Sequence, residues 1–266
     1  MTEHDGHGVE AIGQAFARAR AQGRAALIAY LTLGYPSPAD SPALVRALQD
    51  GGADLIELGV PFSDPLADGP VIQRASHQAL QAGMTPRGCL ELVAQLRREG
   101  IRVPLLLMGY YNPIHAYGPE AYARDAALAG ADGLIVPDLP PEEADPLRAA
   151  CEREGLALVF LVAPTSGEER IARIAAITRG FLYVVSRLGT TGAGRGPGEE
   201  LARQLERVRR HARTPVAVGF GLSRPEQVRR LAPQVDGLIV GSAVVERASE
   251  GAEALYAYLR SLRAVL

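Results

Sequence analysis

Eight short apolar runs divide this chain at nearly regular intervals, with amphipathic segments between them. The runs cover residues 27–33, 55–60, 103–108, 133–136, 156–162, 181–186, 216–219 and 238–240. Each run has the length of a β-strand, and most are apolar throughout instead of alternating with polar residues. Continuous apolar runs are typical of parallel strands buried on both faces. The pattern therefore indicates an α/β protein built on a parallel sheet.

Cap residues mark helices between these runs. Thr85 is placed to cap a helix that starts at Pro86, and Gly100 is placed to end it. Farther along, Ser223 and Glu226 have the spacing of a capping box at the start of another helix. A helix candidate follows each of the eight runs, and one extra helix candidate precedes the first run.

Eight strand–helix repeats in about 250 residues predict a (β/α)8 TIM barrel with an extra N-terminal helix. A doubly wound open sheet is the alternative architecture for the same alternation. No linker or break in composition divides the 266 residues. We therefore expect residues 1–266 to form a single (β/α)8 barrel domain.

Composition excludes several classes of protein. The net charge of -2 gives no indication of a nucleic-acid surface. The sequence contains no lysine, which excludes an aldolase that works through a lysine Schiff base. Two isolated cysteines, a polar N-terminus without an apolar signal core, and no apolar run of membrane-spanning length predict a soluble cytoplasmic protein.

A carboxylate, Glu57, stands inside the second apolar run, where a buried strand ordinarily carries Val or Ile. Side chains alternate along a strand, so Leu55, Glu57 and Gly59 share one face. If that face is the barrel interior, Glu57 points into the pocket mouth, where barrel enzymes place their chemistry. Burial there raises the pKa of a carboxyl group and suits it to proton transfer near neutral pH. The alternative interpretation is a structural Glu paired with an Arg.

The loops that follow the strands carry further candidates. Asp64 and Asp68 lie in a short Pro- and Gly-rich loop after the second run, either as site residues or as ordinary turn residues. Gly221 and Ser242 follow the seventh and eighth runs, where barrels commonly bind phosphate; two ordinary turns are the alternative. Residues 186–200 contain five glycines and form either a lid over the substrate or a loose connection.

The five histidines and two cysteines show no metal-ligand spacing, and the chain has neither a phosphate-binding Walker loop nor a dinucleotide fingerprint. We therefore expect no metal centre and no nucleotide cofactor. A serine–histidine–aspartate arrangement cannot be argued from the sequence either.

The segment LIELGVPFSDPLADGPVIQ, residues 55–73, resembles the most specific motif of the tryptophan synthase alpha subunit family. The resemblance extends over nearly the whole chain, through YLTLGYP, LLMGYYNPI, PDLPPEE, LYVVSRLGTTG, VGFGLS and VGSAVV. It implies a (β/α)8 fold and the cleavage of indole-3-glycerol phosphate to indole and glyceraldehyde 3-phosphate, with no cofactor. It also implies a beta subunit, which uses pyridoxal phosphate, in an α2β2 complex.

The resemblance also assigns roles to residues. Glu57 and Asp68 fall at the two catalytic carboxylates of the family. Tyr183 and Thr191 match active-site positions, and Tyr30 stands where an aromatic residue is common. Substrate-binding positions, mostly on the phosphate side, fall on Gly192, Gly219, Phe220, Gly221, Gly241 and Ser242. The chain departs from the family at Thr190, where many members have Val.

Two other functions stay open at this point. Another phosphate-binding barrel enzyme, such as a sugar-phosphate isomerase or epimerase, would share the glycines after the seventh and eighth runs. It would not need the whole motif at residues 55–73. A catalytically silent subunit that only activates a partner would not need an intact Glu57 and Asp68.

Overall fold

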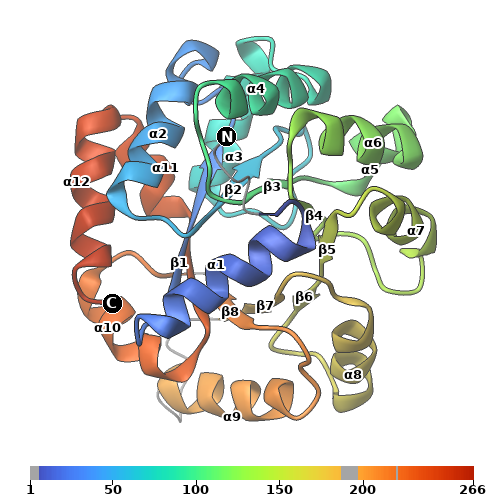
Figure 1. Cartoon of the computed structure of the whole chain (residues 1–266), viewed down its shortest axis with the longest axis vertical. Helices are drawn as coiled ribbons and strands as arrows, with labels where there is room; N and C mark the ends of the chain where they lie inside the picture. The colour runs from blue at the N-terminus through green and yellow to red at the C-terminus, as the bar shows by residue number, and fades with distance from the viewer. Residues whose placement is uncertain (1–5, 187–196, 220) are drawn as a thin grey trace.

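The computed structural model describes residues 6–186, 197–219 and 221–266, and its strands form one parallel sheet (Figure 1). The strands are β1 (Ala26–Thr32), β2 (Leu55–Gly59), β3 (Leu105–Met108), β4 (Gly133–Ile135), β5 (Ala157–Val159), β6 (Leu161–Val162), β7 (Leu182–Val185), β8 (Val216–Gly219) and β9 (Gly237–Val240). The helices are α1 (Val9–Ala21), α2 (Ser41–Gly51), α3 (Pro70–Gln81), α4 (Pro86–Arg98), α5 (Tyr111–Tyr117), α6 (Pro119–Ala129), α7 (Asp145–Arg153), α8 (Glu168–Ile177), α9 (Pro197–Arg209), α10 (Pro225–Leu231), α11 (Ser242–Ala248) and α12 (Ala252–Arg263), with short 3-10 turns at Pro38–Asp40 and Ala232–Gln234.

The sheet closes into a barrel where its two end strands, β5 and β6, follow one another in the chain. The strand order is β5-β4-β3-β2-β1-β9-β8-β7-β6, so β5 and β6 stand at its two ends. In the chain, only Phe160 separates them, and the Tyr183 N–H donates to the Phe160 carbonyl at 3.2 Å. The predicted run 156–162 is therefore one strand position interrupted at Phe160. The prediction of a (β/α)8 barrel is confirmed, and the open-sheet alternative is wrong.

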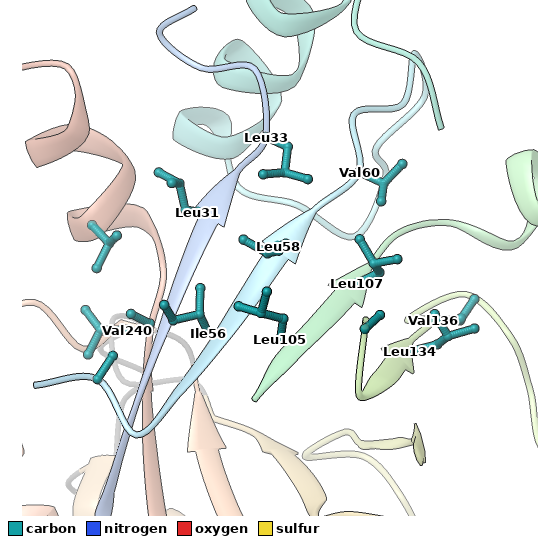
Figure 2. Close-up of a cluster of buried hydrophobic side chains, with 14 of the residues drawn as sticks. Leu31, Leu33, Ile56, Leu58, Val60, Leu105, Leu107, Leu134, Val136 and Val240 are labelled. Carbon is teal, nitrogen blue, oxygen red and sulfur yellow. The ribbon is translucent and has the colours of Figure 1, made fainter. Parts of the chain in front are cut away.

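Alternation along the strands gives the barrel two apolar layers. One set of side chains points outward against the helices, and Figure 2 shows Leu31, Leu58 and Leu107 in this layer on three neighbouring strands. The other set, which includes Ile28 and Leu55, fills the barrel interior. Strands buried on both faces must be apolar throughout, which is why the sequence shows continuous runs.

The extra N-terminal helix is confirmed, and it lies across one end of the barrel. In Figure 1, α1 crosses in front of the strands. The Phe16 ring packs against Phe181 just before β7, with 5.6 Å between ring centroids. Ile12 packs into the same interior cluster, and the Gly8 N–H donates to Asp132 at 2.9 Å. These contacts place α1 at the amino ends of the strands, so the opposite end is the mouth.

The helix starts follow local cap chemistry. Thr85 caps α4 as predicted, because its hydroxyl accepts a hydrogen bond from the Gly88 N–H at 3.1 Å. The predicted cap at Ser223 is wrong by one residue. Arg224 is the cap of α10, and the Gln227 side chain accepts from its N–H at 3.0 Å. Gln227 takes this role because it is the third residue of α10, whereas Glu226 is the second.

Within the described ranges, no helix combines the length and the apolar character needed to cross a membrane.

Candidate active site

Glu57 lies on the inner face of the barrel. It stands in β2 two residues after Leu55, which packs in the interior cluster, and its register partner in β1 is Tyr30. The predicted shared face of Leu55, Glu57 and Gly59 is therefore the interior face. Tyr183 of β7 belongs to the same interior cluster as Tyr30. The strands thus bring two tyrosines and one carboxyl group into the barrel.

The Glu57 carboxyl group is fully buried, and neither oxygen has a hydrogen-bond partner among the residues the structure describes. Burial raises its pKa to about 8, from an ordinary value of 4.5. The alternative interpretation is a structural Glu paired with an Arg. It is not supported, because no Arg among the described residues makes a hydrogen bond or ion pair with this carboxyl group. A neutral, unpaired carboxyl group in a barrel interior is typical of an acid–base residue.

Asp68 lies on the loop between β2 and α3 and is partly buried. Its backbone is held from two sides: its N–H donates to the Pro65 carbonyl at 3.1 Å, and the Gln73 amide donates to the Asp68 carbonyl at 2.9 Å. Burial raises the pKa of Asp68 to about 6, and a hydrogen bond from Tyr110 opposes that rise. In contrast, Asp64 is exposed and accepts a hydrogen bond from Ser63, which is the turn role.

The two interior tyrosines lie within electrostatic reach of both carboxyl groups. Burial raises the pKa of Tyr183, and Glu57 and Asp68 raise it further. Burial also raises the pKa of Tyr30, again with contributions from Asp68 and Glu57. The structure therefore brings Tyr30, Glu57, Asp68 and Tyr183 together at the mouth.

Two neighbouring residues were not predicted. The Tyr110 hydroxyl donates to Asp68 at 3.1 Å, and the Thr32 hydroxyl lies 3.3 Å from the Tyr30 hydroxyl. Their sequence signal is weak: each stands at or just after the end of an apolar run, in YLTLGYP and LLMGYYNPI. A Tyr or Thr there is just as compatible with a purely structural role.

Two strand glycines make room for the tyrosine rings. A Cβ atom at Gly59 would overlap the Tyr30 side chain, and one at Gly219 would overlap the Tyr183 side chain. Gly219 was predicted as a substrate-binding position, and the structure places it against Tyr183. A side chain at either position would displace a ring from the mouth.

The remaining predicted residues lie around β8 and β9. Gly221 has φ +78, a left-handed conformation that favours glycine. Gly241 caps α11, with Ser242 as the first, exposed residue of that helix. A Cβ atom at Gly241 would lie 3.7 Å from the Tyr30 Cβ, so this turn borders the same mouth. Thr191, Gly192 and Phe220, together with most of the glycine-rich loop at 189–198, lie outside the described residues.

Across the described ranges, no group of three or more His, Cys, Asp and Glu side chains is arranged to hold a metal ion.

The whole arrangement has close counterparts in known proteins. The family model described as tryptophan synthase alpha chain matches residues 16–265. A tryptophan synthase alpha chain of Roseiflexus castenholzii is 54% identical over 88% of this chain and 90% of its own length, and one of Roseiflexus sp. (strain RS-1) is 52% identical over 95% and 98%. A solved tryptophan synthase structure from M. tuberculosis is similar with a TM-score of 0.88 and 41% identity, covering 96% of this chain and 97% of that chain.

Proposed function

The chain belongs to the tryptophan synthase alpha chain family, whose reaction is the cleavage of indole-3-glycerol phosphate, and we propose that Glu57 and Asp68 carry out this reaction here. The observation that carries the proposal is the Glu57 carboxyl group, which is buried in the barrel interior with no hydrogen-bond partner among the described residues. The products are indole and glyceraldehyde 3-phosphate, so the enzyme is a carbon–carbon lyase of tryptophan biosynthesis.

The proposed cleavage needs two proton transfers at one end of the barrel. The protonated Glu57 gives its proton to C3 of the indole ring, which leaves a carboxylate. That carboxylate then removes the proton from the glycerol hydroxyl group, a carbonyl forms, and the bond to C3 breaks with its electrons returning to the indole ring. A raised pKa suits Glu57 to both transfers, because the group must hold a proton first and accept one next.

Asp68 supports the same step by electrostatics. When C3 gains a proton, positive charge develops on the indole ring and its N–H becomes more acidic. A carboxylate held by the loop bonds around Asp68 can accept a hydrogen bond from that N–H as the charge develops. Tyr30 and Tyr183, which pack in the interior cluster, would contact the apolar indole ring beside it.

Indole release should therefore follow a bell-shaped pH profile. Activity rises as pH increases through about 6, because Asp68 must lose its proton, and falls as pH increases through about 8, because Glu57 must begin with its proton. The measurement is kcat/KM for indole release from indole-3-glycerol phosphate across this range. A protein that isomerises sugar phosphates and releases no indole would support the rival function instead.

We assign the phosphate group to the turns after β8 and β9. The left-handed Gly221 and the amino end of α11 at Gly241 and Ser242 offer backbone N–H groups to an anion. Binding energy from the phosphate, remote from the reacting bond, then holds the indole ring between the carboxyl groups. Thr191, Gly192, Gly219 and Phe220 remain proposed contacts by resemblance.

Gly221→Val and Ser242→Glu should each raise KM for the phosphate ester by roughly tenfold or more, through crowding and through repulsion. Ser249→Glu adds the same charge at the far end of α11 and serves as the matched control. Binding of indole itself should stay unchanged in all three variants. A loss of indole binding as large as the loss of ester binding would contradict the assignment.

The family implies a beta subunit as partner, and we propose an α2β2 complex in the cytoplasm, with residues 1–266 as one barrel domain. The loop between β2 and α3 supports docking at the mouth, because Leu66 at its tip is 91% exposed.

A further inference from the structure

Tyr110 connects the end of one strand to the loop of its neighbour. Its hydroxyl group donates to Asp68 Oδ2 at 3.1 Å and accepts a hydrogen bond from the Ala67 N–H at 2.9 Å. A tyrosine hydroxyl has one proton to donate, and here Ala67 approaches the oxygen as a donor. The proton is therefore directed to Asp68.

The Tyr110 side chain is itself held in place. It is 7% exposed, and its ring lies 5.3 Å from the Phe62 ring, measured between centroids. The Gly109 N–H on one side donates to the Ile135 carbonyl at 3.0 Å, and the Tyr111 N–H on the other side donates to Asp138 at 2.9 Å. These contacts hold the backbone and the ring of Tyr110 after the end of β3, and so they fix the position of its hydroxyl group.

The hydrogen bond from Tyr110 occupies one oxygen of the Asp68 carboxylate and leaves the other, Oδ1, for contacts with the substrate. Oδ2 accepts the hydrogen bond from the Tyr110 hydroxyl group, whereas Oδ1 accepts no hydrogen bond from the residues that the structure describes. Two bonds from one hydroxyl group to consecutive residues also fix the orientation of the loop at Ala67 and Asp68. Oδ1 is the oxygen that can accept the indole N–H.

We propose that Tyr110 is a positioning residue for the reaction: it holds Asp68 ionised, with Oδ1 directed at the substrate. The inference rests on the role proposed above for Asp68. It assigns Tyr110 no contact with the reacting atoms, so its whole effect passes through Asp68.

The test is Tyr110→Phe, which keeps the ring against Phe62 and removes only the hydroxyl group. We expect kcat to fall roughly tenfold, with little change in KM, because a hydrogen bond to a charged group is lost. Tyr111→Phe is the matched control: its ring is the next one in the chain, and its N–H bond to Asp138 is kept. Circular dichroism and the thermal midpoint establish that both variants are folded.

The pH profile gives a second readout. Among the described residues, the Asp68 charge raises the pKa of Tyr30 from β1, Tyr183 from β7 and Tyr110, so these ionisable groups lie near it. Glu57 from β2 raises the pKa of the same Tyr30 and Tyr183. Among the described residues, Tyr110 stabilises the charged form of Asp68 by a hydrogen bond. Tyr110→Phe should therefore move the acid side of the profile to higher pH and leave the alkaline side in place.

A double-mutant cycle with Asp68→Asn separates positioning from a general structural role. In the Asp68→Asn background, Tyr110→Phe should cause little further loss. The same tenfold loss in both backgrounds, or wild-type kinetics for Tyr110→Phe alone, would overturn the positioning role while leaving Asp68 as proposed. Full activity of Asp68→Asn alone would instead overturn the proposed role of Asp68, and the inference with it.

Discussion

Glu57→Gln should lower the rate of indole release by roughly 10³-fold or more, to the limit of detection, with substrate binding largely kept. Gln has nearly the same shape but can neither give a proton to C3 nor remove one from the glycerol hydroxyl group. Positioned acid–base groups contribute about 10²–10⁴-fold each, and this single carboxyl group serves both transfers. The measurement is single-turnover release of indole from saturating indole-3-glycerol phosphate. Turnover near that of the wild type would remove Glu57 from the proton transfers.

The same variant has a built-in control for folding. The folded pKa of Glu57, about 8, exceeds its ordinary value of 4.5, so the native state binds more protons than the unfolded state between these values. Stability is therefore lost as pH rises through this window, at roughly 1.4 kcal/mol per pH unit at most. Glu57→Gln lacks that loss, and its thermal midpoint at pH 8 should not be lower than that of the wild type. An inactive but less stable variant would indicate a structural defect.

Asp68→Asn should lower kcat by roughly 10²-fold, because one preorganised charge next to the developing positive ring is removed. KM should change much less, because the charge on the ring exists mainly in the transition state. Asp64→Asn is the matched control from the same loop, because Asp64 is exposed and its carboxylate accepts a hydrogen bond from the Ser63 hydroxyl group. A variant that affects only KM would move Asp68 from the chemistry to substrate binding.

The strands could be predicted from the sequence because a strand buried on both faces appears as a continuous run of apolar residues. All eight predicted runs contain strands, within a few residues of their observed ends. The break of the fifth run at Phe160 could not be predicted, since 156–162 is apolar throughout. The hydrogen bonds of the two neighbouring strands decide that break, and these form only when the barrel closes.

The place of Glu57 could also be predicted, because the period of two assigns it to a face once Leu55 is known to be inside. The role of Tyr110 could not be predicted from the sequence. Its contact with Asp68 spans 42 residues and depends on β2 and β3 being neighbours with a defined register. Gly219 illustrates the same limit: the resemblance assigns it to substrate binding, but only the structure identifies Tyr183 as its neighbour.

Helix α1 covers the amino ends of the strands, at the end of the barrel opposite the mouth. Phe16, Phe181 and the interior apolar layer pack in the barrel on the amino-end side of Glu57. The Glu57 carboxyl group is fully buried, and a bound substrate in the mouth would cover it further during turnover. The proposed chemistry tolerates this, since the proton given to C3 is replaced by the one taken from the glycerol hydroxyl group. Glu57 ends each cycle in the protonation state in which it began. The proposed reaction therefore needs no proton exchange between Glu57 and solvent.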